Sequence, residues 1–412
     1  MDGEETVDVT QFSHFDQEYA ANPGRMWTAV RDHPGVAYSE QHGGYHVLAR
    51  YDHIYEAARD PELFCSGQGN VIPPFPFPPL IPVNVDPPLL HLYRKILQPS
   101  LTPTKVAERE NEYRALADSL LDGFLAKARD GEVVDLMEEF AVPFPQQVAL
   151  RVIGFPDEDR HTTAQSIYDL SHLRGIDDTV VEKAAAQVIG RITELIAERR
   201  AAPRREDLFS VLLDADIEGR PLDDQELLFY IFLLLAGGLD TTTAAISGAF
   251  LYLGQNPQDR SRLLSDEALT RSAATEFVRW TSPAQGLART LTRDTVFEGC
   301  PMKAGDKALL LFAAGNRDER KFESPDEVQL DRYPNHHLGF GMGPHRCLGA
   351  HLALLMIQIA VERGLTKLGD FQVVDPDRLE WVGGETFGLK RLPVRLGPAP
   401  PDGSKERFDG DS

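Results

Sequence analysis

Apolar residues recur three and four positions apart through most of the chain between about residue 86 and residue 265. This spacing places them on one face of a helix, so it predicts a mainly helical region. Residues 45–49, 285–312 and 380–396 instead alternate in polarity or carry many β-branched side chains, which predicts strands. We therefore expect a mostly α fold with a minor β region.

The longest helical pattern begins at Asp223, with Glu226 three residues later as in a helix-start motif, and runs to Leu253. A helix of roughly 30 residues is about 45 Å long, so it has to cross the whole domain. The longest apolar run, residues 227–236, is well short of the ~20 residues that span a bilayer. The pattern therefore favours a helix buried inside the protein, and not a membrane anchor.

Composition narrows the class of protein further. The chain has 412 residues, with 42 Lys and Arg against 64 Asp and Glu, for a formal net charge of −22. An acidic surface of this size disfavours nucleic acids and anionic membranes as partners. No linker or repeat divides the chain, and the N-terminus has no apolar signal region. We expect a soluble cytoplasmic monomer with one domain over residues 1–398 and a disordered tail at 399–412.

Three cysteines, Cys65, Cys300 and Cys347, are widely spaced. Their odd number and spacing predict neither a disulfide framework nor a C-x-x-C metal motif, which fits a reducing compartment.

Cys347 lies in a glycine-rich segment just before an apolar helical pattern. Glycines at 341, 343 and 349 allow positive φ and close approach of a flat, bulky group. A cysteine near a helix N-terminus is favoured as a thiolate. A single thiolate is a poor zinc site, because zinc takes four ligands, but it suits the axial position of haem iron. The alternative is an ordinary buried cysteine.

The middle of the long helix, residues 236–243, contains two glycines and three threonines. These are poor residues for a helix interior, and such a conflict with local propensity often marks a functional site. A threonine hydroxyl can bond to an earlier carbonyl and bend the helix, leaving room for a small ligand. A kink with a structural role alone is the alternative.

Two motifs together resemble those of the cytochrome P-450 superfamily. Residues 340–353 match F-G-x-G-x-H-x-C-x-G-x-x-L-A, and residues 237–242 match [AG]-G-x-[DE]-T-[TS]. The resemblance is to the soluble bacterial, class I type and implies a triangular helical prism around a long central helix. It also implies haem b (iron protoporphyrin IX) with Cys347 as the proximal thiolate ligand, together with O2 and external electrons.

The same resemblance implies roles for single residues. Thr241 would hydrogen-bond dioxygen, and Asp240 would relay protons to it, which is sensible because O–O cleavage consumes two protons. Gly237, Phe340 and Gly349 would lie against the cofactor.

A structural brace is also implied. Glu276 and Arg279, three apart on a helix, match the family's E-x-x-R pair, and Arg332 fits the third position. Outside this context, E-x-x-R is usually a solvated pair.

Haem propionates need cationic donors, and Arg94, Arg289 and His345 match the family positions. The chain departs from many soluble relatives at Leu89-Leu90, where they carry Glu-His. His91 is displaced by one residue, about 100° around a helix. We therefore expect the three matched residues, and not His91, to hold the propionates.

The apolar, proline-rich loop at 71–84 corresponds to the roof of the family's substrate pocket and implies an apolar substrate of small to medium size. The candidate lining residues are Phe75, Phe77, Leu233, Ala236, Leu287, Thr386 and Phe387.

No electron-transfer domain is recognised in the chain, so electrons would come from a ferredoxin with its reductase. Small ferredoxins are acidic, so the contact needs a local basic patch. The candidates are Arg94, Lys95, Lys105 and Arg346.

The implied activity is a monooxygenase that inserts one oxygen atom of O2 by hydroxylation or epoxidation, possibilities including natural-product, terpenoid or steroid metabolism. Other haem-thiolate chemistry, namely desaturation, aromatic coupling or peroxide-driven oxidation, stays open, as does a haem-based sensor. The sequence does not identify the substrate.

Overall fold

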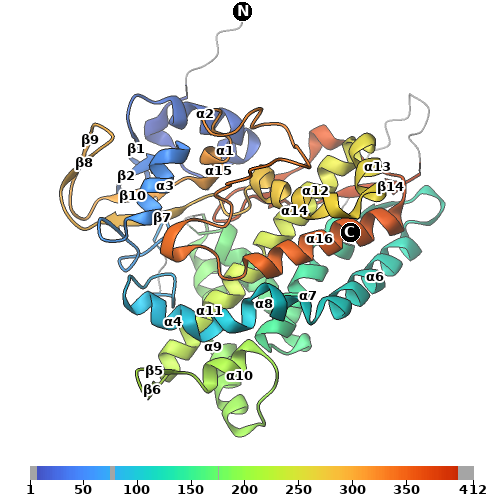
Figure 1. Ribbon diagram of the computed structural model, residues 1–412, viewed down its shortest axis with the longest axis horizontal. Coiled ribbons are helices and arrows are strands. Elements are labelled where there is room, and N and C mark those ends of the chain that lie inside the picture. Colours follow the sequence, from blue (N-terminus) through green and yellow to red (C-terminus); the bar gives the residue numbers. More distant parts are fainter. Residues whose placement is uncertain (1–6, 75–78, 175, 398–412) are drawn as a thin grey trace, which may run out of the picture.

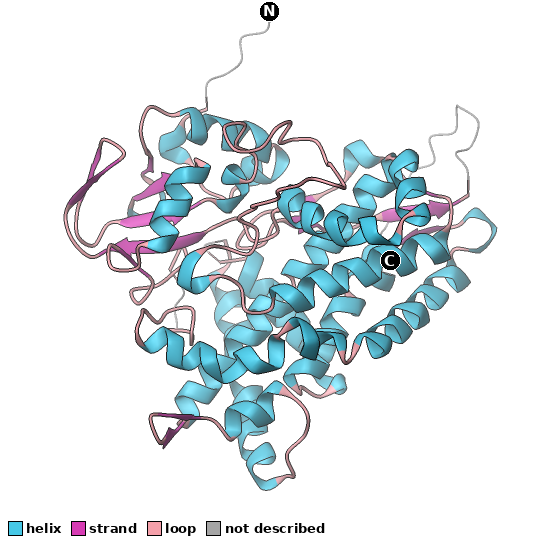
Figure 2. Cartoon of the chain, viewed as in Figure 1, coloured by secondary structure: helices cyan, strands magenta, loops and turns pink. Residues whose placement is uncertain are grey.

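The computed structural model describes residues 7–74, 79–174 and 176–397 (Figure 1). Phe75, Phe77 and the tail expected at 399–412 lie outside the described residues. Helices make up most of the described chain, and the strands gather mainly beside the N-terminal helices (Figure 2). The expected mostly α fold with a minor β region is confirmed.

The helices cover both the N-terminal region and the large helical part. Their bounds are α1 Gln17–Ala21, α2 Pro23–Asp32, α3 Tyr51–Arg59, α4 Leu89–Leu97, α5 Pro103–Ala107, α6 Glu110–Lys127, α7 Pro143–Ile153, α8 Arg160–His172, α9 Asp178–Ala201, α10 Leu208–Leu213, α11 Asp224–Gly238, α12 Thr241–Gln255, α13 Pro257–Ser265, α14 Glu267–Thr281, α15 Phe312–Gly315 and α16 Ala350–Leu368.

The strands are short. Their bounds are β1 Ala37–Ser39, β2 Tyr45–Leu48, β3 Phe64–Cys65, β4 Val133–Asp135, β5 Asp216–Ile217, β6 Arg220–Pro221, β7 Leu287–Leu291, β8 Thr295–Phe297, β9 Cys300–Met302, β10 Lys307–Leu310, β11 Phe371–Val373, β12 Trp381–Val382, β13 Gly388–Leu389 and β14 Pro393–Leu396.

The main sheet has the order β1-β2-β10-β7-β3. Strand β10 runs parallel to β2 and antiparallel to β7, so Arg289 on β7 lies opposite Ala308. A second sheet, β11-β14-β4, joins a short strand near residue 134 to the end of the chain. The region expected to be helical between 86 and 265 thus also contains β4 and the β5–β6 hairpin, because β4 finds its partner far away in sequence.

The expected long central helix is present, but two residues divide it. Asp223 begins α11 with a reciprocal capping box that includes Glu226, and α12 follows after Leu239 and Asp240. By length and apolar composition alone, residues 224–255 would be long enough to cross a membrane. However, 56% of the most apolar window is buried inside the fold, as expected for a core helix.

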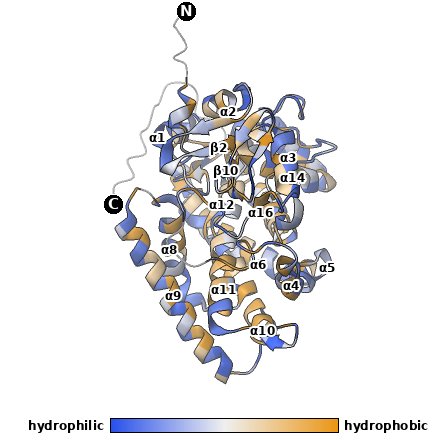
Figure 3. Cartoon of the chain, turned by 90° about the vertical axis from the view of Figure 1, so that its left-hand side faces the viewer, coloured by the Kyte–Doolittle hydropathy of each residue, from blue (hydrophilic) through white to orange (hydrophobic). Residues whose placement is uncertain are grey.

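The largest hydrophobic core lies where α12, α14 and α16 pack together with α6. Helix α9 lies at the outer edge and packs on α8 and α11, with hydrophobic and hydrophilic residues alternating along it (Figure 3). A separate core, which contains Tyr19 and Trp27, fills the space between the main sheet and the N-terminal helices. The broken central helix therefore crosses the interior, where both of its halves contact neighbouring elements.

Candidate active site

The segment that carries Cys347 is a tight loop ahead of α16. The Cys347 amide donates a 2.8 Å hydrogen bond to the Phe340 carbonyl, which closes the loop. Gly341 and Gly343 have φ of +65° and +69°, as their glycine identity predicts. Gly349 differs from that expectation, because its φ is −82° and it is the residue that precedes α16. A Cβ at this position would lie 4.0 Å from Cys347 Sγ, which is an ordinary van der Waals contact.

Burial of Cys347 opposes the thiolate that its position near a helix N-terminus predicts. Burial raises the pKa of the thiol above its usual value, although the Gly349 N–H and the charges of Arg94 and Arg346 act in the opposite direction. The protein groups by themselves therefore do not favour the thiolate. The side chain is surrounded by protein yet solvent-accessible, as expected for a side chain that lines a cavity. A metal cation bound to the sulfur would supply the missing stabilisation of the anion.

Behind the loop, Glu276, Arg279 and Arg332 come together. Arg279 donates to both carboxylate oxygens of Glu276 at 2.8 and 2.7 Å, and Arg332 Nε lies 3.1 Å from each of them. Asn335, which the sequence did not single out, donates a further bond of 3.1 Å to Glu276. Arg279 also bonds to the Asn316 carbonyl. The cluster thus ties α14 to the segment that leads into the Cys347 loop.

Basic side chains gather around His345 in the same loop. Arg289 is buried, with 3% of its surface exposed, and Arg94 donates a 2.7 Å bond to the Arg346 carbonyl. Burial, followed by the charges of Arg289, Arg94 and His91, lowers the pKa of His345 to about 3. The buried Nε2 of His345 has no hydrogen-bond partner among the described residues. Such a group of donors is suited to an anion.

Arg289 shows the same demand for an anion. The one hydrogen bond that its guanidinium group makes within the described part of the chain is to the neighbouring Ala288 carbonyl. Burial lowers the pKa of Arg289 to about 10, and the charges of Asp86 and Cys65 offset this only in part. His91 is exposed, but it lies close enough to His345 to affect its pKa. The expectation that His91 takes no propionate stays a prediction.

The break between α11 and α12 has the predicted geometry. The Thr241 hydroxyl donates a 3.1 Å bond to the Gly237 carbonyl, four residues earlier. A Cβ on Gly237 would have no atom within 4 Å, apart from its own helix backbone and neighbours, so this face of α11 borders open space. Gly238 instead faces α7, where a Cβ would contact Ala149 at 3.5 Å. The break therefore leaves room beside Gly237 and Thr241 for a bulky group.

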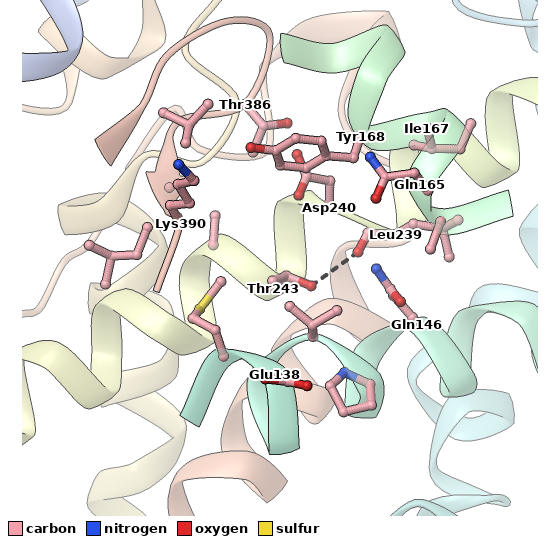
Figure 4. Close-up of a pocket in the computed structure, with 18 of the residues that line it drawn as sticks. Glu138, Gln146, Gln165, Ile167, Tyr168, Leu239, Asp240, Thr243, Thr386 and Lys390 are labelled. Carbon is pink, nitrogen blue, oxygen red and sulfur yellow. Dashed lines mark hydrogen bonds between the residues drawn. The ribbon is translucent and has the colours of Figure 1, made fainter. Parts of the chain in front are cut away.

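Asp240 points to a different side from Thr241. Its Oδ2 lies 2.9 Å from Nε2 of His172, at the end of α8. The sequence did not identify His172, because it is a lone histidine 68 residues before Asp240. Asp240 also lines a cavity of about 460 Å³ between α7, α8, α12 and the 382–391 segment (Figure 4). Thr243 and Thr386 line the same cavity.

The remaining expected pocket residues have mixed environments. Leu233, Ala236 and Leu287 are half-buried. Phe387 is buried in the N-terminal core, where its ring stacks on Trp381 with centroids 4.9 Å apart and meets the edge of Tyr19. Core packing thus explains the burial of the Phe387 ring without a role in the substrate pocket.

Comparison with known proteins agrees with this geometry. The family model described as Cytochrome P450 matches residues 157–377. A steroid C26-monooxygenase of Mycobacterium tuberculosis is 35% identical over 367 residues, covering 87% of this chain and 97% of the relative. Cytochrome P450-terp of a Pseudomonas species is 29% identical, covering 91% and 93%.

Solved structures are similar over nearly the whole chain. A Mycobacterium marinum cytochrome P450 in complex with pseudoionone has a TM-score of 0.84 at 27% identity, covering 96% of this chain and all of that one. A cytochrome P450 of Novosphingobium aromaticivorans has a TM-score of 0.83 at 25% identity, covering 96% and 99%.

The chain belongs to the cytochrome P450 family. It is a haem-thiolate monooxygenase that acts on organic substrates with O2 and electrons from a redox partner. The residues present fit that cofactor. Cys347 holds the ligand position on its loop, and the unpaired His345 Nε2 and the poorly compensated Arg289 suit propionates. Open space beside Gly237 suits a flat macrocycle.

Proposed function

We propose that Asp240 and Thr241 deliver protons to dioxygen in this enzyme, and that the substrate is an apolar terpenoid or steroid of small to medium size. Haem supplies the oxygen-activating chemistry, and the Cys347 thiolate supplies electron density that favours O–O cleavage. The observation that carries the proton-delivery role is the geometry of the break. The Thr241 hydroxyl lies next to the open space beside Gly237, while Asp240 lines a cavity on another side of the helix.

Each of the two residues has a distinct part in the proposed delivery. The Thr241 hydroxyl donates its hydrogen to the Gly237 carbonyl, so its oxygen lone pairs can accept a hydrogen bond from a proton-carrying group such as a water molecule and hold it beside the open space. Asp240 can exchange protons with water in the cavity, since a carboxylate both accepts and returns a proton readily. Asp240 and Thr241 are consecutive residues at the break, so the path from the cavity to Thr241 is short.

The substrate class rests on the relatives and on the pocket side chains. One relative carries the name of a steroid monooxygenase, another is named P450-terp, and a similar structure holds pseudoionone. Leu233, Ala236 and Leu287 are apolar and only half-buried, so they are available to an apolar ligand. We propose these three residues, with Thr386, as lining residues of the substrate pocket.

We further propose that an acidic ferredoxin donates the electrons to this enzyme in the cytoplasm. Lys95 on α4 and Arg346 beside Cys347 are exposed, and Arg94 joins them through its bond to the Arg346 carbonyl. Positive charge at this face would steer an acidic partner toward the cysteine side despite the net negative charge of the chain.

The Thr241→Ala variant tests the proton-delivery role. Product formed per electron pair should fall by about tenfold to a hundredfold, with peroxide released in its place, because general acid catalysis of this kind contributes at least that much. Thr243→Ala is the matched control, since Thr243 also donates a 3.1 Å bond to a carbonyl four residues earlier. Unchanged coupling in Thr241→Ala would remove Thr241 from the mechanism.

The substrate class is tested by titrating steroids and terpenoids while recording the haem spin-state spectrum. No spectral response to either class would overturn the proposed substrate class.

A further inference from the structure

His172 has a hydrogen-bond acceptor on each of its ring nitrogens. Nδ1 lies 2.8 Å from the Gly383 carbonyl oxygen, and Nε2 lies 2.9 Å from Oδ2 of Asp240. A carbonyl oxygen carries no proton, and an ionised carboxylate carries none. Both nitrogens therefore have to donate, which only the doubly protonated, charged imidazolium can do.

The contact is shielded from water on the histidine side. The side chain of His172 is 4% exposed, and that of Asp240 is 18% exposed. Burial opposes a charge on His172, but the hydrogen bond and charge of Asp240, with the Gly383 carbonyl, outweigh it and raise its pKa above the ordinary value. A charge-assisted bond in such surroundings is stronger than a neutral one.

Other charged groups face the pair from each neighbouring element. On α8 itself, the Tyr168 ring lies 4.4 Å from the His172 ring, and Asp169 is a weaker source of negative charge. In the 382–391 segment, Glu385 is paired with Arg174 just beyond the helix. The other titratable side chains that line the cavity are Asp135, Glu138, Arg160, His161, Lys390 and Arg391. Positive and negative groups are mixed, so Asp240 is the dominant partner of His172.

The end of α8 and the residues just beyond it are held to the 383–385 turn at three positions. The Glu385 amide donates a 3.0 Å bond to the Ser171 carbonyl, His172 bonds to the Gly383 carbonyl, and Arg174 pairs with Glu385. Among these residues, His172 is the one whose ring also reaches the break between α11 and α12. It thus joins three parts of the chain: the end of α8, the turn before β13, and Asp240.

We propose that His172 is a positioning residue for Asp240, which as an imidazolium fixes the carboxylate at the cavity wall and makes proton delivery dependent on closure of α8 over the 383–385 turn. This inference rests on the proposed role of Asp240. When His172 loses a proton, one ring nitrogen becomes an acceptor, so one of the two bonds is lost. Either α8 separates from Gly383 or Asp240 loses its anchor.

The sign of the pH effect follows from the raised pKa. The two-sided contact is complete below the pKa of His172 and is lost as the pH rises through it. Coupling of electrons to product should therefore decline on the alkaline side. Removing the Asp240 charge should lower the pKa of His172, because that charge is what raises it.

The first test measures the protonation of His172 directly. Holoenzyme with carbon-13 in its histidine rings is followed by NMR in the diamagnetic ferrous carbon monoxide form, and His172→Gln identifies the resonance. The expected titration midpoint lies above about 6.5, the ordinary histidine value, and it falls by about one unit or more in Asp240→Asn. A midpoint at or below the ordinary value, or one that Asp240→Asn leaves unchanged, would overturn the proposal.

The second test asks whether the contact matters for turnover. Wild type should lose coupling severalfold as the pH rises through the midpoint found by NMR. His172→Gln should lack this alkaline limb, the decline of coupling at high pH, since an amide donates to Asp240 without titrating. His161→Gln, an exposed histidine of the same helix at the same cavity, should keep it. An alkaline limb retained in His172→Gln would refute the positioning role.

These outcomes separate this inference from the proton-delivery proposal. If Thr241→Ala leaves coupling intact, the delivery role fails while the NMR midpoint still stands as a property of the His172–Asp240 pair. Carbon monoxide spectra and melting temperatures of each variant establish that the compared proteins are folded and contain haem.

Discussion

Nε of Arg279 donates a 2.8 Å hydrogen bond to Oε2 of Glu276, and neither side chain is exposed to solvent. Burying two charges is costly unless each is paired and further hydrogen-bonded. Here Arg332 and Asn335 complete the partners of Glu276, and backbone carbonyls complete those of Arg279. The pair therefore holds the Cys347 loop region in one arrangement.

Glu276→Gln should destabilise the protein by about 3 to 5 kcal/mol, because it leaves the Arg279 charge buried without its counter-ion. Melting temperature followed by circular dichroism measures the loss. Glu108→Gln is the matched control, since Glu108 also pairs with a basic residue three positions away but is exposed. It should leave the melting temperature unchanged, and equal effects of both variants would contradict the buried-pair argument.

The effect of Glu276→Gln on stability should depend on pH. Burial raises the pKa of Glu276, but Arg279, the Gln329 amide and Arg332 together outweigh it, so the net shift is downward from the ordinary value. A lowered pKa gives stability that is present above the ordinary carboxyl value and is lost as the pH falls through the folded-state value. The difference in melting temperature between Glu276→Gln and wild type should therefore shrink only below the ordinary carboxyl pKa.

Arg289→Gln should release haem faster, by about tenfold, since a charge-assisted bond to a propionate is lost. Transfer of haem to apomyoglobin gives the rate. Arg260→Gln removes an equally buried guanidinium that bonds to Asp370 and the Phe371 carbonyl, on α13. That control should lower stability without changing the haem release rate of the folded protein, and unchanged release from Arg289→Gln would exclude Arg289 as an anchor.

Gly343→Ala should lower haem content and cost about 1 to 3 kcal/mol through an unfavourable positive φ. The added Cβ would also overlap the backbone carbonyl of Ala58 on α3, so the Cys347 loop has to move. Gly299 has a similar φ of +76° with no atom within 4 Å of an added Cβ. Gly299→Ala should thus keep full haem content in purified protein, and equal haem content in the two variants would contradict displacement of the loop.

Lys95→Glu should raise the KM for a ferredoxin by about tenfold at low ionic strength, because it reverses a steering charge at the cysteine side. The effect should shrink as salt screens the interaction. Lys183→Glu makes the same charge change on the exposed surface of α9 and should leave the KM unaltered. A KM that responds equally to both substitutions would point to net charge instead of a docking face.

Local patterns in the sequence were sufficient for much of the fold and site. The capping box at Asp223 and the glycine and threonine run at 236–243 predicted both the central helix and its interruption, since capping and helix propensity are local properties. The glycines at 341 and 343 likewise have the positive φ that their position suggested. Gly349 lacks the expected positive φ, because it is the residue that precedes α16 and has a φ of −82°.

The sequence by itself determined the family, the ligand cysteine and the alternation of helix and strand, because these depend on residue identity and short-range spacing. Only the tertiary structure decided which partners the buried charges have. The raised pKa of the Cys347 thiol, the unpaired His345 nitrogen and the contact of His172 with Asp240 all depend on burial and on groups distant in sequence. Charge–charge energies inside a protein depend on distance and surroundings in space, which no local pattern encodes.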